Sequence, residues 1–292
     1  MSRPARPPEH SPEPPVLTEE GRVLRHEHHP GGQGILTLHA PGIAAHARPG
    51  SFVHARCDPL LPMRRPMSVM GARDDRIEIL YKITGRGTLL LSHAAEGAPL
   101  DLLGPIGRPF RPDPGRPRKF LVAGGVGLPP VLFLAESLAR EGRDPGALLF
   151  LYGSELPFPL ALLEESGAPT ELARARALGI PSALASRACR RPGIHPGHVT
   201  DLLAVRLSAL SPSEREAAEV AACGPAPMLA EVQRLCRLHG VPGELCLEEL
   251  MACAVGGCGG CTVAIRTDAG IAMKRVCVDG PVFSSEAVVF AA

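Results

Sequence analysis

The sequence predicts a multidomain protein made of an antiparallel β-barrel, a parallel α/β domain and a small cysteine-rich module. Three observations predict this class. Short apolar runs separated by turn residues fill positions 17–112, strand-like and helix-like segments alternate over 113–240, and cysteine and glycine are concentrated in 241–292. A chain of 292 residues with 45% hydrophobic residues can bury a separate core in each of two larger domains.

Composition excludes several classes of partner. The 31 basic and 30 acidic residues leave a net charge of +1, so no sequence-wide basic field exists to hold nucleic acid or an anionic membrane. The amino terminus lacks the pattern of a secretory signal, and the most apolar stretch, 121–139, is interrupted by glycines and prolines. We therefore expect a cytoplasmic protein that does not cross a membrane. Nine cysteines, an odd number, argue against a disulfide framework in that compartment.

The first 112 residues divide into a tail and a barrel. Residues 1–16 are rich in proline and have almost nothing to bury, which predicts a disordered tail. From 17 to 112 the apolar runs and turns are typical of a small antiparallel barrel. The expected strands lie at 35–38, 51–55, 67–70, 77–83 and 100–103.

Positions 113–240 predict a Rossmann-like domain. Segment 111–119 has the proline content of a linker, and the apolar run 120–123 then enters a glycine turn that opens a helix over 128–140. Alternating strands and helices are typical of a parallel sheet with helices on both faces. Further strands are expected at 147–152, 182–185 and 220–223, and further helices at 160–178, 199–207 and 227–239.

Four cysteines in the final module have a spacing that indicates an iron–sulfur cluster. They follow C-x4-C-x2-C with a fourth cysteine after fifteen more residues, and the intervening glycines let backbone N–H groups approach the thiolates. A 2Fe-2S cluster needs such a loop and one distant thiolate, whereas a zinc site usually pairs two short knuckles. Zinc and plain structural thiols are the alternatives. The predicted ligands are Cys253, Cys258, Cys261 and Cys277.

A candidate flavin site lies in the barrel. Arg65 and Ser68 flank a rigid proline at the head of a strand, where a guanidinium and a hydroxyl could bind a diphosphate. Alone, this motif also describes an exposed arginine beside a turn, but an aromatic, a cation and a glycine-rich turn follow at the same edge of the barrel. The residues predicted to contact the flavin are Arg65, Pro66, Met67, Ser68, Leu80, Tyr81, Lys82, Gly87 and Thr88.

A candidate nucleotide site follows the first strand of the α/β domain. The run 124–130 leaves a strand and opens a helix, so Gly125 and Gly127 could admit a dinucleotide phosphate near the helix N-terminus. The run is not the G-x-G-x-x-G fingerprint, and a purely structural turn is the alternative. Cys223 ends a later strand, where its small side chain could pack against nicotinamide or simply be buried.

Taken in order, these motifs resemble the ferredoxin-reductase superfamily. The segments 247–253 (L-E-E-L-M-A-C) and 276–283 (V-C-V-D-G-P-V-F) resemble, more narrowly, the electron-transfer subunits of class 1B dihydroorotate dehydrogenases. The resemblance implies an FAD-binding barrel, an NAD-binding domain and a 2Fe-2S domain. It also implies a separate FMN-containing catalytic subunit, in a heterotetramer of two plus two, that feeds electrons from dihydroorotate through the cluster and FAD to NAD+ during pyrimidine (UMP) biosynthesis. No catalytic residue is expected in this chain.

Two departures from the family pattern bear on this interpretation. Ala254 stands where relatives usually have glycine, and the run 185–191 (A-S-R-A-C-R-R) replaces an acidic segment. Loss of the acid removes a partner for the ribose hydroxyls, and Ser186 with Arg187 resembles the 2'-phosphate clamp of NADP-using reductases. NADP is therefore an alternative to NAD. A surface arginine run in an arginine-rich chain is the simpler interpretation.

Two other functions compete with this one. Reductase subunits of a sulfide dehydrogenase, a bifurcating transhydrogenase or a hydrogenase complex would share all three cofactors. The bifurcating type commonly uses an aspartate as one cluster ligand, so the presence of Cys253 favours the dihydroorotate function. A regulatory subunit that merely keeps the fold is the other alternative, and the complete cofactor motifs argue against it.

Overall fold

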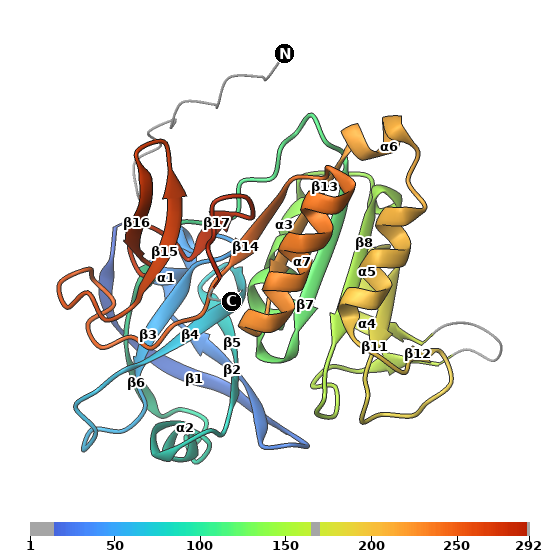
Figure 1. Cartoon of the computed structure of the whole chain (residues 1–292). Coiled ribbons are helices and arrows are strands. Elements are labelled where there is room, and N and C mark those ends of the chain that lie inside the picture. Colours follow the sequence, from blue (N-terminus) through green and yellow to red (C-terminus); the bar gives the residue numbers. More distant parts are fainter. Residues whose placement is uncertain (1–14, 165–169, 291–292) are drawn as a thin grey trace.

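A closed barrel and a seven-stranded sheet lie side by side in the computed structural model, which describes residues 15–164 and 170–290 (Figure 1). Nearly all of the predicted tail, 1–16, lies outside the described residues. The predicted fold class is confirmed: the barrel is antiparallel, six of the seven sheet strands are parallel, and a small hairpin module follows.

The barrel closes in the strand order β1-β2-β5-β4-β3-β6. Side chains alternate across its wall because successive residues of a strand point to opposite faces. Leu36 and Leu38 therefore enter the barrel core, whereas Ile35 packs against the core of the α/β domain. The elements are β1 Leu17–His29, β2 Gln33–His39, α1 Pro41–His46, β3 Phe52–Arg56, β4 Arg65–Arg73, β5 Arg76–Lys82, α2 Arg86–Leu91 and β6 Pro99–Ile106.

Strand β1 was not predicted, although it is the longest strand in the described structure. Its sequence, LTEEGRVLRHEHH, buries only Gly21 and Val23, so it lacks the apolar run that marks the other strands. Its place is set instead by pairing with β2 on one side and β6 on the other. The five predicted runs coincide with β2 to β6.

The α/β domain has the strand order β12-β11-β8-β7-β13-β14-β17. Phe120 and Val122 of β7 face the core beneath α5 and α7, and Leu121 and Ala123 face the core beneath α3. Helices therefore cover both faces, as predicted. The elements are β7 Arg118–Gly124, η1 Gly125–Gly127, α3 Leu128–Arg140, η2 Pro145–Ala147, β8 Leu148–Gly153, β11 Ser182–Ala185, β12 Ile194–His195, α5 Val199–Ser208, α6 Pro212–Glu216, β13 Ala218–Cys223 and α7 Ala226–His239.

The helix predicted over 160–178 is wrong. The described part of this segment forms a two-stranded sheet of β9 (Leu162–Leu163) and β10 (Glu171–Leu172), followed by the single-turn helix α4 (Ala173–Arg176). Residues 165–169 lie outside the described structure. In the sequence, Pro169 lacks the N–H that a helix interior needs and disfavours helical backbone at the residue before it, which opposes a continuous helix.

The carboxyl-terminal segment is attached to the α/β sheet as well as forming its own hairpin. Strand β14 (Gly243–Cys246) pairs in parallel with β13, and β17 (Val282–Ser284) closes the sheet antiparallel to β14. Between them, β15 (Thr262–Thr267) and β16 (Gly270–Arg275) form a separate hairpin. A division after position 240 thus separates α7 from strands that extend the sheet of the preceding domain.

The predicted linker 111–119 is anchored to the α/β domain. Its last residue, Lys119, belongs to β7, is 2% exposed and donates hydrogen bonds to the Asp113 carbonyl and to the Glu219 carboxylate. Within 15–164 and 170–290, no helix is both long and apolar enough to span a membrane.

Candidate functional site

A cavity of about 460 Å³ opens between the barrel and the carboxyl-terminal segment. The structure brings every predicted barrel residue except Gly87 to its lining, because the end of β5 and the start of β4 meet there. The predicted residues that line it are Arg65, Pro66, Met67, Ser68, Leu80, Tyr81, Lys82 and Thr88.

Gly87 acts on this cavity through Arg65. A Cβ atom at Gly87 would lie 2.9 Å from Arg65 Nε, so the glycine allows the guanidinium to pass close to α2. Arg65 Nη1 donates to the carbonyls of Met63 and Arg64 at 2.9 and 3.1 Å, which fixes the plane of the group. Thr88 Oγ1 accepts the N–H of Thr84 at 2.9 Å and so holds the turn that precedes α2. A preorganised cation and a rigid turn thus stand at one end of the cavity.

The opposite wall of this cavity comes from the segment after β14, namely residues 246–251. Surrounding chain desolvates the Glu248 carboxyl and raises its pKa. Cys223 does not line the cavity: it is fully buried behind the wall, and its Sγ lies 3.9 Å from Glu248 Oε1. Burial and the neighbouring Cys246 thiol raise the pKa of Cys223 well above its ordinary value. Cys223 is therefore a neutral thiol.

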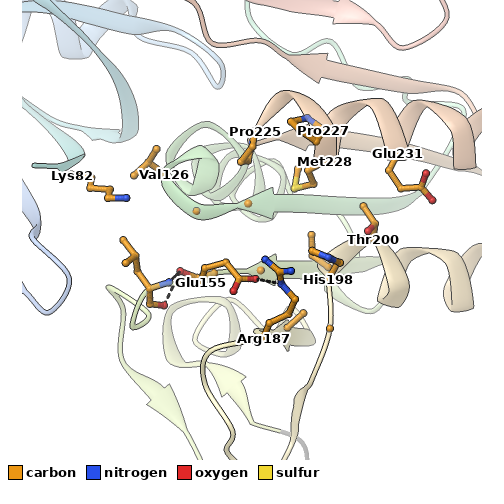
Figure 2. Close-up of a pocket in the computed structure, with 18 of the residues that line it drawn as sticks. Lys82, Val126, Glu155, Arg187, His198, Thr200, Pro225, Pro227, Met228 and Glu231 are labelled. Carbon is orange, nitrogen blue, oxygen red and sulfur yellow. Dashed lines mark hydrogen bonds and ion pairs between the residues drawn. The ribbon is translucent and has the colours of Figure 1, made fainter. Parts of the chain in front are cut away.

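A second cavity, of about 560 Å³, follows the carboxyl edge of the α/β sheet and shares Lys82 and Val126 with the first (Figure 2). Gly125 lines it, in the left-handed conformation with φ of 54°. Gly127 does not line it: a Cβ atom there would lie 2.5 Å from the backbone of Cys223, so this glycine allows the start of α3 to pack against the end of β13.

Charged side chains stand at the other end of the second cavity. Arg187 Nε and Glu155 Oε1 form an ion pair at 3.0 Å, drawn as a dashed line in Figure 2. Ser186 is buried, and its hydroxyl accepts the N–H groups of Ala188 and Cys189 at 3.2 and 2.9 Å. The two residues of the predicted clamp therefore differ in role, because Ser186 shapes the turn while Arg187 reaches the cavity.

The four predicted cluster cysteines lie on two segments that meet in two pairs. Cys261 Sγ and Cys277 Sγ are 3.3 Å apart, and the N–H of Cys258 donates to Cys253 Sγ at 3.4 Å. Within the described residues no three cysteine, histidine or acidic side chains converge on one point as ligands of a single ion would. Two pairs of thiols fit a binuclear cluster, in which each iron takes two protein ligands.

Backbone donors in the cysteine loop favour a thiolate. The N–H groups of Val255 and Cys258 lower the pKa of Cys253 to about 7, whereas burial and the Cys261 thiol raise the pKa of Cys277 to about 12. Ala254 has φ of 57°, in the left-handed region that glycine adopts without a steric penalty. The loop thus keeps its wrapped form although alanine replaces the glycine that was expected there.

Comparison with known proteins identifies the family. Residues 248–289 match the family described as the iron-sulfur cluster binding domain of dihydroorotate dehydrogenase B. The chain is 33% identical to the "Dihydroorotate dehydrogenase B (NAD(+)), electron transfer subunit" of Caldanaerobacter subterraneus, over 83% of this chain and 87% of the relative. A subunit of the same name from Desulforamulus reducens is also 33% identical, over 87% of this chain and 92% of the relative. The chain belongs to this family of electron-transfer subunits. The predicted family, oxidoreductase class and electron-transfer function are thereby confirmed.

Solved structures show the same fold at lower identity. The electron-transfer subunit described here aligns with a chain of an NADH-dependent reduced ferredoxin-NADP oxidoreductase at a TM-score of 0.72 and 22% identity, over 92% of this chain and 89% of the other. A ferredoxin NADP+ reductase from Neisseria gonorrhoeae, solved with FAD and NADP, gives a TM-score of 0.59 at 16% identity, over 76% and 93% of the two chains.

Several cavity residues of this electron-transfer subunit were not predicted from sequence. Glu155 and Glu231 in the second cavity, and Cys246 in the first, lie near the ends of strands or on a helix without any local motif. A rule that ligands lie beyond the carboxyl ends of parallel strands would have selected Glu155, which follows β8, but not Glu231 on α7.

Proposed function

We propose that this chain carries electrons from an FMN-containing dihydroorotate-oxidising subunit to NAD+, with FAD and a 2Fe-2S cluster as its own cofactors, in de novo pyrimidine biosynthesis. One observation carries the proposal, which is the continuity of the three sites. Lys82 and Val126 line both cavities, and Met251, which lines the first cavity, precedes Cys253 by two positions. An electron entering at the cysteine loop would therefore meet the first cavity and then the second.

The first cavity fits a flavin dinucleotide. It combines a fixed guanidinium at Arg65, a hydroxyl at Ser68 and apolar walls, within the usual volume of a cofactor site. Arg65 would bind the diphosphate, and Leu80 and Tyr81 would contact the ring system. Flavin supplies the exchange between single electrons and a hydride, which nicotinamide alone does not offer.

The second cavity fits a pyridine nucleotide. The close approach of α3 to β13, which Gly127 permits, leaves the backbone at Gly125 open to a phosphate. The shared residues Lys82 and Val126 would hold the nicotinamide end against the flavin. Hydride exchange between two such rings needs stacking and exclusion of water rather than a general base, and the protein residues supply both.

The cysteine loop fits a 2Fe-2S cluster. Cys253 with Cys258, and Cys261 with Cys277, would each hold one iron. The donors that lower the pKa of Cys253 would also stabilise negative charge on the cluster sulfurs and so set its potential.

The partner follows from the family, because an electron-transfer subunit requires a catalytic subunit. A heterotetramer of two plus two and a cytoplasmic location are part of the proposal. The subunit alone is expected not to oxidise dihydroorotate, since nothing in its sequence indicates an FMN site.

Co-purification tests the proposal. The tagged chain, expressed in its own host, should recover an FMN-containing chain that oxidises dihydroorotate, at a mass that fits two copies of each. Recovery of a hydrogenase, a sulfide dehydrogenase or a transhydrogenase chain would replace the proposed partner. Purified protein without flavin absorbance and without iron would contradict the electron-transfer mechanism itself.

A further inference from the structure

The second cavity has a defined direction, and this inference rests on the nucleotide site proposed above. Lys82 and Val126, which it shares with the flavin cavity, mark the end for the nicotinamide ring. Arg187 and Glu231 lie toward the other end in Figure 2. Because NAD is an extended dinucleotide, its adenosine ribose would reach the side chains of this second end.

The acid that is missing after β11 is replaced in space by Glu155, which follows β8. Strands β8 and β11 are parallel neighbours, so the segments after them emerge side by side at the same sheet edge. There Glu155 Oε1 meets Arg187 Nε at 3.0 Å, and both side chains stay more than half exposed to the cavity and solvent, at 51% and 60%. Both groups are therefore accessible to a bound ribose.

Nearby charges leave the choice of nucleotide to this pair. Glu231 is bound in an ion pair with Arg234 at 2.8 Å, and Asp201 accepts the backbone N–H of His198 at 2.7 Å. Ser186, the other member of the predicted clamp, gives its hydroxyl oxygen to two backbone N–H groups. Arg187 is thus the cation that could take a 2'-phosphate, and Glu155 is the carboxylate that already occupies it.

We propose that Glu155 is the specificity-determining residue that selects NAD over NADP, by accepting the ribose 2'-hydroxyl and by withholding Arg187 from a 2'-phosphate. A carboxylate can accept a hydrogen bond from a hydroxyl but repels a phosphate group. Removing its charge releases the guanidinium, whose planar donors match phosphate oxygens. Specificity here is a repulsive element built beside an attractive one.

The test uses ADP-ribose and 2'-phospho-ADP-ribose, which lack nicotinamide and report on the adenosine end alone. Titration calorimetry on the flavin-loaded chain should show ADP-ribose binding at least about tenfold more tightly than its 2'-phosphorylated form. Glu155→Gln should reduce or reverse that ratio by about tenfold or more, mainly by strengthening the 2'-phosphorylated ligand. Adding Arg187→Gln to Glu155→Gln should abolish the gain.

A matched control comes from Glu164, which pairs with Arg191 at 3.1 Å with similar exposure but does not line the cavity. Glu164→Gln should leave the ratio unchanged. Flavin absorbance and the melting temperature of each variant check that it folds. An unchanged ratio in a folded Glu155→Gln variant that still binds ADP-ribose overturns this inference alone, whereas failure of the unaltered chain to bind either fragment overturns the nucleotide site as well.

Discussion

The Sγ atoms of Cys261 and Cys277 lie 3.3 Å apart, although 16 positions separate the two residues in sequence. The hairpin of β15 and β16 spans that interval and returns the chain to its start, since Thr262 is paired with Arg275. The fourth cluster ligand is therefore placed by a β-hairpin rather than by a second short knuckle. This is why a single distant cysteine can complete the set.

Replacing Cys277 with serine should remove the cluster and leave the flavin. A metal site that loses one of four thiolates binds its metal far less tightly, while no cluster cysteine lines the flavin cavity. Iron content and the visible spectrum should show FAD without iron. Cys189→Ser, which changes a half-buried thiol in the α/β domain, should retain both cofactors. A fully loaded cluster in the Cys277→Ser variant would contradict the ligand assignment.

Replacing Gly127 with alanine should destabilise the α/β domain. The added Cβ would lie 2.5 Å from the backbone of Cys223, so α3 must move away from β13 at a cost of about 1–3 kcal/mol. The free energy of unfolding, measured in denaturant, should fall by that amount. Gly85→Ala is the matched control, because Gly85 has extended backbone and no atom within 4 Å of a new Cβ. Equal stability of the two variants would rule out the packing role of Gly127.

Arg174 should join the barrel to the α/β domain. Its guanidinium bonds Glu78 of β5 at 2.5 Å and Glu136 of α3 at 2.6 Å, with all three side chains largely enclosed. Arg174→Gln would leave two carboxylates facing each other, which should cost about 2 kcal/mol of stability at neutral pH. Arg176→Gln, on the same helix but in an exposed pair with Glu171, should cost less than about 1 kcal/mol. The comparison is read from chemical denaturation, and similar losses in both variants would refute the role of Arg174.

Glu244 should make the protein less stable as pH rises. Burial and the neighbouring Glu219 carboxylate raise its pKa to about 7, against the hydrogen bond from the Arg111 N–H and the charges of Arg111 and Lys119. A carboxyl whose pKa is higher in the folded state binds a proton more tightly there, so stability is lost between its unfolded pKa and about pH 7.

The Glu244→Gln variant tests this dependence. The glutamine should be more stable than the natural residue at pH 8, by about 2 kcal/mol, and the difference should vanish near pH 5. Melting temperatures of the two proteins across this range supply the measurement. A constant difference across the range would mean that Glu244 does not titrate in it.

The sequence predicted those parts of the molecule that depend on local chemistry. The cysteine spacing, the helix over 128–140 and most cavity-lining residues of the barrel follow from neighbours along the chain. Strand β1 escaped prediction because its partners, not its own apolar residues, hold it in the barrel. The role of Arg187 could not be foreseen because Glu155 reaches it through the pairing of β8 with β11.

The most direct test of the central claim is the formation of NADH from NAD+ by the purified complex supplied with dihydroorotate. The account predicts rapid NADH formation when both subunits are present and none when either is omitted. It also predicts that the Cys277→Ser complex oxidises dihydroorotate with an artificial acceptor but no longer forms NADH. Undiminished NADH formation by that variant, once shown to lack iron, would contradict the claim that electrons leave the partner through these four thiols.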